Sequence, residues 1–180
     1  MIPFLHIGSL QIPTFFFVIS LSLTGLLFLL SSRVDHFSKD RKMAFDFALL
    51  LMFSSFIGGR LLHVFYEEWD YYKADPKLIL YFWQGGFVFL GGLAFSFITG
   101  YLYTRYKKIS FLEWADFFTP LFSLAHSLGR IGCFLSGCCF GVQCTLPWAY
   151  AGNHPTALYL SIGEFFIFLI LLGLEKKQVF

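Results

Sequence analysis

Two arginines, Arg60 and Arg130, stand inside long apolar stretches of the chain. A charged side chain inside a membrane costs roughly 2.5–3.5 kcal/mol even on a lenient insertion scale, so each arginine needs a partner, a route to the interface or a function. A guanidinium at headgroup depth can hold a lipid phosphate through two parallel hydrogen bonds. We expect this chemistry of Arg130, whereas structural pairing or snorkelling toward water is the competing interpretation of Arg60.

Arg130 belongs to a set of residues that recur with the period of a helix. Steps of four, three and four place the set in one narrow stripe on a helix: His126, Arg130, Cys133 and Gly137. His126 lies one turn before the arginine, where a hydrogen-bonding link between helices is one interpretation of a histidine. Gly129 and Gly132 flank Arg130 and would let a ligand or another backbone approach closely.

All four cysteines fall within twelve residues: Cys133, Cys138, Cys139 and Cys144. A compartment outside the cytoplasm permits disulfides, so a cross-linked loop is one interpretation. A reactive thiol is another, because Arg130 would favour the thiolate. A metal site is less well supported, since no CxxC spacing is present and nearby histidines are few. We expect no metal and no organic cofactor.

The third apolar stretch carries two glycine pairs, Gly85-Gly86 and Gly91-Gly92. Small residues in membrane helices usually permit close helix packing. The alternative is a broken or re-entrant start of this stretch, which would line a cavity. Glu164, near the middle of the last stretch, is expected to be a hydrogen-bonded packing residue or a partner for an arginine.

The composition indicates that these residues are positioned by membrane helices. The chain is 57% hydrophobic and 13% charged, whereas a soluble domain carries about 25% charged residues. Five apolar stretches approach or exceed the ~20 residues that a transmembrane helix needs, and they are continuous rather than alternating, which disfavours a barrel. We predict an all-α membrane protein in which residues 1–180 form a single domain, with five transmembrane helices near 12–30, 45–66, 78–103, 116–134 and 155–174.

Basic residues are distributed unequally between the connecting loops. Nine fall on one side: Arg33, Lys39, Arg41, Lys42, Arg105, Lys107, Lys108, Lys176 and Lys177. Lys73 and Lys77 fall on the other side, so the positive-inside rule predicts an outside N-terminus and a cytoplasmic C-terminus. The first stretch lacks a basic segment before it and is expected not to be a cleaved signal peptide. The net charge of +2 lies in short loops and gives no indication of nucleic-acid binding.

Several of these residues lie in motifs that resemble a known family. The run Gly129-Arg130-Ile131-Gly132-Cys133-Phe134, followed by Gly137 and Gly141, resembles the signature of bacterial prolipoprotein diacylglyceryl transferases. Other motifs similar to the family occur in the family's order: Gly58-Gly59-Arg60-Leu61, Trp83-Gln84-Gly85-Gly86, Gly91-Gly92-Leu93, Asp116 with Pro120, and His154-Pro155-Thr156 with Leu158-Tyr159 and Glu164.

The resemblance implies transfer of a diacylglyceryl group from phosphatidylglycerol to the lipobox cysteine of a prolipoprotein, at the outer leaflet of the bacterial cytoplasmic membrane. Arg130 would stabilise charge on the departing glycerol phosphate. Leu90 stands where the family has a histidine, so His126 is the predicted substitute base, with His63 or His154 behind it. Phosphatidylglycerol, membrane lipid and the prolipoprotein signal peptide are the expected partners. The expected substrate-binding residues are Arg130, Arg60, Gly129, Gly132, Gly137, Gln84, Gly85, Gly86, His154 and Tyr159.

The chain also departs from the family pattern. Cys133, Ser136 and Cys138 replace two asparagines and a glutamate of the signature, and the sequence ends before the family's last functional arginine. We expect a compact or truncated, cysteine-bearing member. Two alternatives stay open: a non-catalytic paralogue that binds lipid or lipoprotein, and an outer-face thiol redox or metal module that uses the four cysteines.

Overall fold

Helices build most of the chain in the computed structural model, which describes residues 4–8 and 10–175. Lys176 and Lys177, which contribute to the charge count, lie outside the described residues. The chain divides into two compact units, Met1–Arg33 with Ala115–Phe180 and Val34–Trp114, and each is described by itself. The expectation of a single domain stays a prediction.

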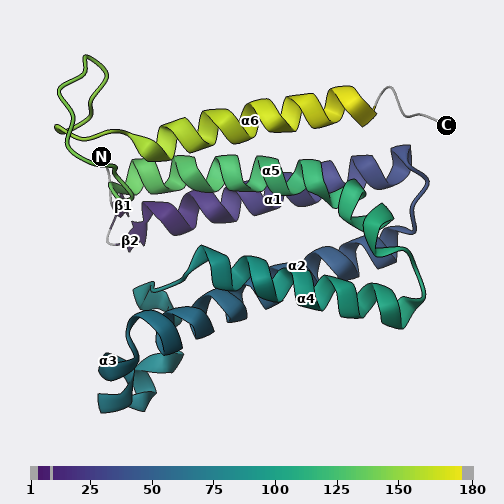
Figure 1. The fold of residues 1–180 in the computed structure, drawn as a ribbon, viewed down its shortest axis with the longest axis horizontal. Helices are drawn as coiled ribbons and strands as arrows, with labels where there is room; N and C mark the ends of the chain where they lie inside the picture. Colours follow the sequence, from purple (N-terminus) through teal and green to yellow (C-terminus); the bar gives the residue numbers. More distant parts are fainter. Residues whose placement is uncertain (1–3, 9, 176–180) are drawn as a thin grey trace. The chain divides into compact units, whose positions relative to one another are not determined.

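The first unit contains three long helices that run alongside one another (Figure 1). They are α1 (Thr14–His36), α5 (Phe111–Ser136, whose first turn belongs to the second unit) and α6 (Thr156–Glu175). An antiparallel hairpin of β1 (Phe4–Ile7) and β2 (Leu10–Pro13) precedes α1. This hairpin was not predicted from the sequence, and it departs from the expected all-α architecture.

A buried arginine ties the three helices of the first unit together near the C-terminal ends of α1 and α6. The guanidinium of Arg33 donates hydrogen bonds to both carboxylate oxygens of Glu175, at 2.9 and 2.7 Å, and to the carbonyl oxygen of Phe117 at 2.9 Å. A two-pronged bond of this kind fixes the orientation of the planar guanidinium. The register of α6 beside α1 and α5 is therefore specified at this end.

The second unit pairs α2 (Arg41–Leu62) with α4 (Phe89–Lys107), side by side in Figure 1. The Asp40 side chain caps α2 by accepting a hydrogen bond from the Met43 amide. The helix then continues as a π-helical turn, His63–Glu67, which leads to α3 (Trp69–Ala74) and to the 3-10 turns Pro76–Leu80 and Phe82–Gln84. These short turns occupy the stretch before α4.

The third predicted helix begins later than the sequence suggested. Residues 78–103 form an uncharged run, but the helix starts at Phe89 and continues to Lys107. Pro76 and the two left-handed glycines Gly85 and Gly86, with φ of +88° and +77°, are incompatible with a continuous helix through residues 78–88. Hydrophobicity therefore did not predict the conformation of this segment.

The two glycine pairs have different structural roles. A Cβ atom on Gly91 would overlap the Gly58 carbonyl and lie 2.6 Å from the Leu62 Cβ, and one on Gly92 would lie 2.7 Å from the Ser55 hydroxyl. Gly91 and Gly92 thus permit α4 to approach α2 closely, as small residues do in membrane helices. The helix-packing interpretation holds for this pair and the broken-helix interpretation holds for Gly85 and Gly86.

Three of the described helices are long and apolar enough to cross a membrane: Thr14–His36, Arg41–Glu67 and Thr156–Glu175. The other two long helices are less apolar along their length, since α4 contains three glycines and three tyrosines and α5 contains Asp116, His126 and Arg130. A predominantly helical membrane protein is thus supported, and the expected number of five spans stays a prediction.

Candidate functional site

A chain of three side chains connects α6 to the arginine of the signature. The Glu164 carboxylate lies 3.0 Å from His126 Nδ1, and the Arg130 Nε–H donates a hydrogen bond to His126 Nε2 at 3.1 Å. His126 and Arg130 are one turn apart on α5, as the helical period predicted, and Glu164 reaches them from α6. The side chains of His126 and Glu164 are 15% and 23% exposed, so solvent competes little for these bonds.

The bonding pattern assigns the tautomer of His126. Because Nε2 accepts from Arg130, the proton of the neutral ring lies on Nδ1 and points at the Glu164 carboxylate. A carboxylate on one ring nitrogen fixes both the tautomer and the orientation of the imidazole. Glu164 therefore orients His126, and His126 in turn orients the guanidinium of Arg130.

Two serines of α5 hold Glu164 and its helix in place. The Ser123 hydroxyl lies 2.8 Å from Glu164 Oε2 and 2.8 Å from the Glu164 carbonyl oxygen. One turn further, the buried Ser127 hydroxyl lies 2.8 Å from the Ser161 carbonyl oxygen. The sequence analysis expected Glu164 to be a hydrogen-bonded packing residue or a partner for an arginine, and its hydrogen bonds to Ser123 and His126 fit the first of these.

The expected role of the flanking glycines in ligand binding stays a prediction, and the structure adds a packing role. A Cβ atom on the buried Gly132 would lie 3.3 Å from Phe15 and 3.4 Å from Val18, both on the α1 side. The half-buried Gly129 is less confined, since its Cβ would meet only Ile19, at 3.7 Å, an ordinary contact. Small residues here permit α5 to lie against α1.

Gly137 ends α5 and brings three thiols together. Its φ of +84° reverses the chain, so that the Cys138 amide bonds the Cys133 carbonyl at 3.1 Å and the Gly137 amide bonds the Phe134 carbonyl at 3.2 Å. This is the glycine-terminated helix cap of the Schellman type. The sulfur atoms of Cys133, Cys138 and Cys139 consequently lie within 4.8 Å of one another, and we call these three residues the thiol cluster.

The four cysteines are free thiols in this structure. Burial raises the pKa of the Cys139 thiol above its ordinary value, and the hydrogen bond with Cys138, 3.2 Å away, adds to this rise. The Arg130 charge acts in the opposite direction on the same pKa. The arginine is therefore close enough to act electrostatically on the cluster, but it does not make Cys139 a ready thiolate at neutral pH.

His154 and Tyr159 lie where the chain enters α6. The Tyr159 hydroxyl is 3.2 Å from His154 Nδ1, and the His154 backbone pairs with Gly141 and Val142 across the loop between α5 and α6.

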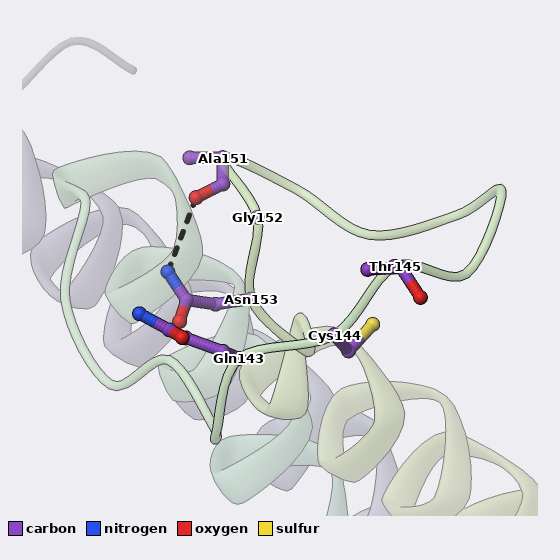
Figure 2. Close-up of a pocket in the computed structure, with 6 residues that line it drawn as sticks. All are labelled: Gln143, Cys144, Thr145, Ala151, Gly152 and Asn153. Carbon is purple, nitrogen blue, oxygen red and sulfur yellow. Dashed lines mark hydrogen bonds between the residues drawn. The ribbon is translucent and has the colours of Figure 1, made fainter.

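Figure 2 shows an open hollow further along this loop, lined by Gln143, Cys144, Thr145, Ala151, Gly152 and Asn153. Neither Arg130 nor His126 lines that hollow.

Arg60 is fully engaged with the irregular stretch before α4. Its Nη1 donates to the carbonyls of Gly85 and Gly86 at 2.6 and 3.2 Å, and its Nε and Nη2 donate to the carbonyl oxygens of Ile79, Leu78 and Tyr81. The aromatic rings of Tyr72 and Phe87 lie 5.1 and 5.9 Å from the guanidinium carbon. Arg60 is 7% exposed, so it pairs structurally rather than snorkelling, and its expected contact with substrate stays a prediction.

Other residues singled out in the second unit are Gly86, His63, Leu90 and Gln84. A Cβ atom on Gly86 would collide with the His63 ring and lie 2.8 Å from Arg60 Nη1. His63, a reserve candidate for the base, contacts Glu67 through Nδ1 at 2.8 Å. Leu90, at the position of the family histidine, is 65% exposed in the first turn of α4. The Gln84 backbone closes a 3-10 turn, and its side chain lies outside what the structure describes.

Comparison with known proteins agrees with the motifs of the site. Residues 3–180 match the family model described as prolipoprotein diacylglyceryl transferase. Proteins named phosphatidylglycerol–prolipoprotein diacylglyceryl transferase from Finegoldia magna and Clostridioides difficile are 36% and 35% identical over 68% and 74% of this chain. A third protein, named phosphatidylglycerol–prolipoprotein diacylglyceryl transferase 2 and found in Clostridium perfringens, is 32% identical over 96% of this chain.

The matched regions cover 50% and 55% of the first two relatives and 72% of the third, so the chain spans about half the length of the first relatives it matches. The family match itself extends over nearly the whole chain. The chain therefore belongs to the prolipoprotein diacylglyceryl transferase family.

Proposed function

We propose that this chain transfers a diacylglyceryl group from phosphatidylglycerol to the lipobox cysteine of a prolipoprotein. Family membership supports the reaction class, and one contrast between the two arginines supports the site. All three side-chain nitrogens of Arg60 donate hydrogen bonds to backbone carbonyl oxygens. Arg130 bonds His126 through Nε, and its two terminal nitrogens hold no hydrogen bond within the described part of the chain. Four N–H donors of a half-buried guanidinium are thus available to an anion.

In the proposed reaction the cysteine thiolate of the prolipoprotein attacks the glycerol carbon that carries the phosphate ester. A carbon–sulfur bond forms as the carbon–oxygen bond breaks, and glycerol phosphate leaves with the bonding electron pair. The thiol proton goes to a base. Negative charge grows on the departing phosphate oxygen, so the terminal N–H groups of Arg130 would bind the leaving group more strongly in the transition state than in the substrate.

His126 has two candidate roles in this scheme. It was predicted as the base, and to take the thiol proton its Nε2 would have to exchange the bond from Arg130 for one from the substrate. The geometry favours the other role, in which His126 and Glu164 hold the guanidinium in the orientation that phosphate binding requires. Preorganised donors of this kind do not need to reorient as the reaction proceeds.

We place the site at the outer leaflet of the bacterial cytoplasmic membrane. The support is the unequal distribution of basic residues, nine against two, together with the position of Arg130 near the C-terminal end of α5. This proposal includes five transmembrane helices, an outside N-terminus, a cytoplasmic C-terminus, and phosphatidylglycerol, membrane lipid and the prolipoprotein signal peptide as partners.

The test is transfer by the purified protein. The protein is solubilised in detergent and mixed with a lipobox peptide and with phosphatidylglycerol that carries a label in its acyl groups. The rate at which the peptide acquires the label is then measured. Arg130→Lys keeps the charge but loses the planar fork, so we expect roughly tenfold slower transfer or worse. Arg130→Gln removes the charge as well, and we expect a loss on the order of 10²–10³-fold, as when a key oxyanion donor is removed.

The matched control is Arg105→Lys, at an exposed arginine near the C-terminal end of α4, which should transfer at the parental rate. Thermal unfolding of each variant separates lost chemistry from lost folding. Parental transfer rates in a stably folded Arg130→Gln variant would contradict the assignment of the arginine. If the parent binds phosphatidylglycerol but labels no peptide, the non-catalytic lipid-binding paralogue replaces this proposal.

A further inference from the structure

The thiol cluster has the composition and geometry of a metal site. Its three sulfur atoms lie within 4.8 Å of one another, and those of Cys138 and Cys139 are 3.2 Å apart. A zinc–sulfur bond is about 2.3 Å long, so three thiolates around one zinc ion are separated by about 3.8–4.0 Å. The side chains of Cys138 and Cys139 are exposed and can change rotamer to adjust their sulfur separations toward these values.

The fold of the helix end creates this proximity. The turn at Gly137 stacks Cys138 over Cys133, and the Cys138 amide and thiol both contact the Cys133 carbonyl, at 3.1 and 3.4 Å. Cys139 then adopts a left-handed conformation with φ of +63°, which is unfavourable for a residue that bears a side chain. Three sulfurs thus converge from the last turn of one helix and the two residues after its glycine.

We infer that Cys133, Cys138 and Cys139 bind one zinc ion through three sulfur ligands, with the fourth position open to water. Thiolates select soft or borderline-soft cations over magnesium and calcium, which prefer oxygen. A divalent ion leaves a net charge of −1 on three thiolates, whereas a monovalent copper ion would leave −2. The positive charge of Arg130 acts on the Cys139 thiol and would offset this remaining negative charge.

A neighbouring hydroxyl completes the surroundings of the ligands. The Ser136 hydroxyl donates to the Cys133 carbonyl at 3.0 Å and lies 3.6 Å from the Cys138 sulfur, within reach of a thiolate. Outer groups of this kind orient metal ligands. Cys144 lies instead on the hollow of the loop and is not a member of the cluster, so it offers a natural control.

Metal content of the full chain tests the inference. The protein is purified in detergent under reducing conditions without a polyhistidine tag, dialysed against dilute Zn²⁺ and analysed for zinc. We expect one zinc per chain in the parent and in Cys144→Ser. Loss of a thiolate ligand should weaken binding about tenfold or more in Cys133→Ser, Cys138→Ser and Cys139→Ser, and the triple variant should retain none.

Substitution with Co²⁺ supplies a second readout that does not depend on activity. Sulfur-to-cobalt charge transfer should give an intense near-ultraviolet band in the parent and in Cys144→Ser, and no band in the triple variant. Circular dichroism and gel filtration identify any variant that fails to fold. Three results would overturn the inference: no zinc in a parent with free thiols, parental zinc in the folded triple variant, or a disulfide within the cluster after alkylation in intact cells.

Discussion

The Nε–H of Arg130 donates a hydrogen bond to Nε2 of His126 at 3.1 Å. This bond fixes the arginine through the nitrogen nearest its stem and uses none of the four terminal N–H groups. Arg60 has the opposite arrangement, since hydrogen bonds to five carbonyls engage all three of its nitrogens. The two arginines thus have different chemical capacities: the fold engages all three side-chain nitrogens of Arg60, and Arg130 can still bind a ligand.

Replacement of Arg60 should lower stability. Arg60→Lys keeps the charge but reaches fewer carbonyls, and each buried carbonyl that loses its partner costs roughly 1–3 kcal/mol. We expect a lower midpoint of thermal unfolding for Arg60→Lys and a larger decrease for Arg60→Leu. Arg105→Lys, at an exposed site, should leave the midpoint unchanged. An unchanged midpoint for Arg60→Lys combined with weaker phosphatidylglycerol binding would instead support the role of Arg60 as a substrate ligand.

Alanine at the helix contact in the second unit should also be destabilising. A Cβ atom on Gly58 would overlap Phe95 and lie 2.5 Å from the Gly91 carbonyl oxygen, and backbone cannot move away cheaply. Overpacking of this kind costs about 1–3 kcal/mol, so the thermal midpoint of Gly58→Ala should fall.

The matched control for Gly58→Ala is Gly163→Ala on α6, where a Cβ would meet nothing within 4 Å. Alanine has the higher helix propensity, so this variant should be as stable as the parent or slightly more stable. If both alanines lower the midpoint equally, the destabilisation does not come from contact between α2 and α4.

Local sequence period predicted the relationship between His126 and Arg130, because one turn of a helix is a local property. It did not predict that Glu164 holds His126, since that contact depends on the register of α6 against α5. The sequence showed four cysteines close together but not which of them converge: their spacing matches no zinc pattern, and the glycine cap at Gly137 brings three sulfurs together.

Hydrophobicity did not predict the conformation of residues 78–88. The uncharged run at 78–103 indicated one helix, yet its first eleven residues form 3-10 turns and a left-handed glycine pair. A helix would have satisfied the carbonyls of this segment internally. Instead a distant side chain, Arg60, satisfies five of them, and no local pattern could have indicated this.

The proposed topology can be tested by cysteine labelling in a background in which the four native cysteines are serine. Val142→Cys, at a 77% exposed position in the loop after α5, should react in intact cells with a maleimide that cannot cross the membrane. Lys107→Cys, at the end of α4, should react only after the cells are permeabilised. Protection of position 142 together with labelling of position 107 would place Arg130 near the cytoplasmic face and remove the outer-leaflet site.

The two candidate roles of His126 predict different outcomes for one substitution. In His126→Gln the amide oxygen can still accept a hydrogen bond from Arg130 Nε, but the side chain cannot take a proton from a thiol. In His126→Phe both capacities are lost. If His126 positions Arg130, Gln should retain most transfer and Phe should lose it by about 10–100-fold, the equivalent of one hydrogen bond to a charged group. If His126 is the base, the two variants should be equally impaired.

Glu164 supplies the independent arm of this test. Glu164→Ala frees the imidazole to rotate and should therefore slow transfer in the parent. The same substitution should slow transfer little further when Arg130 is already Lys, because the effects of residues that act as a unit do not add. His36→Gln, at an exposed histidine of α1, is the matched control and should transfer at the parental rate. Fully additive losses in the Glu164→Ala, Arg130→Lys double variant, with all proteins equally stable, would mean that the bond between His126 and Arg130 does not carry the effect of Glu164 to the reacting phosphate.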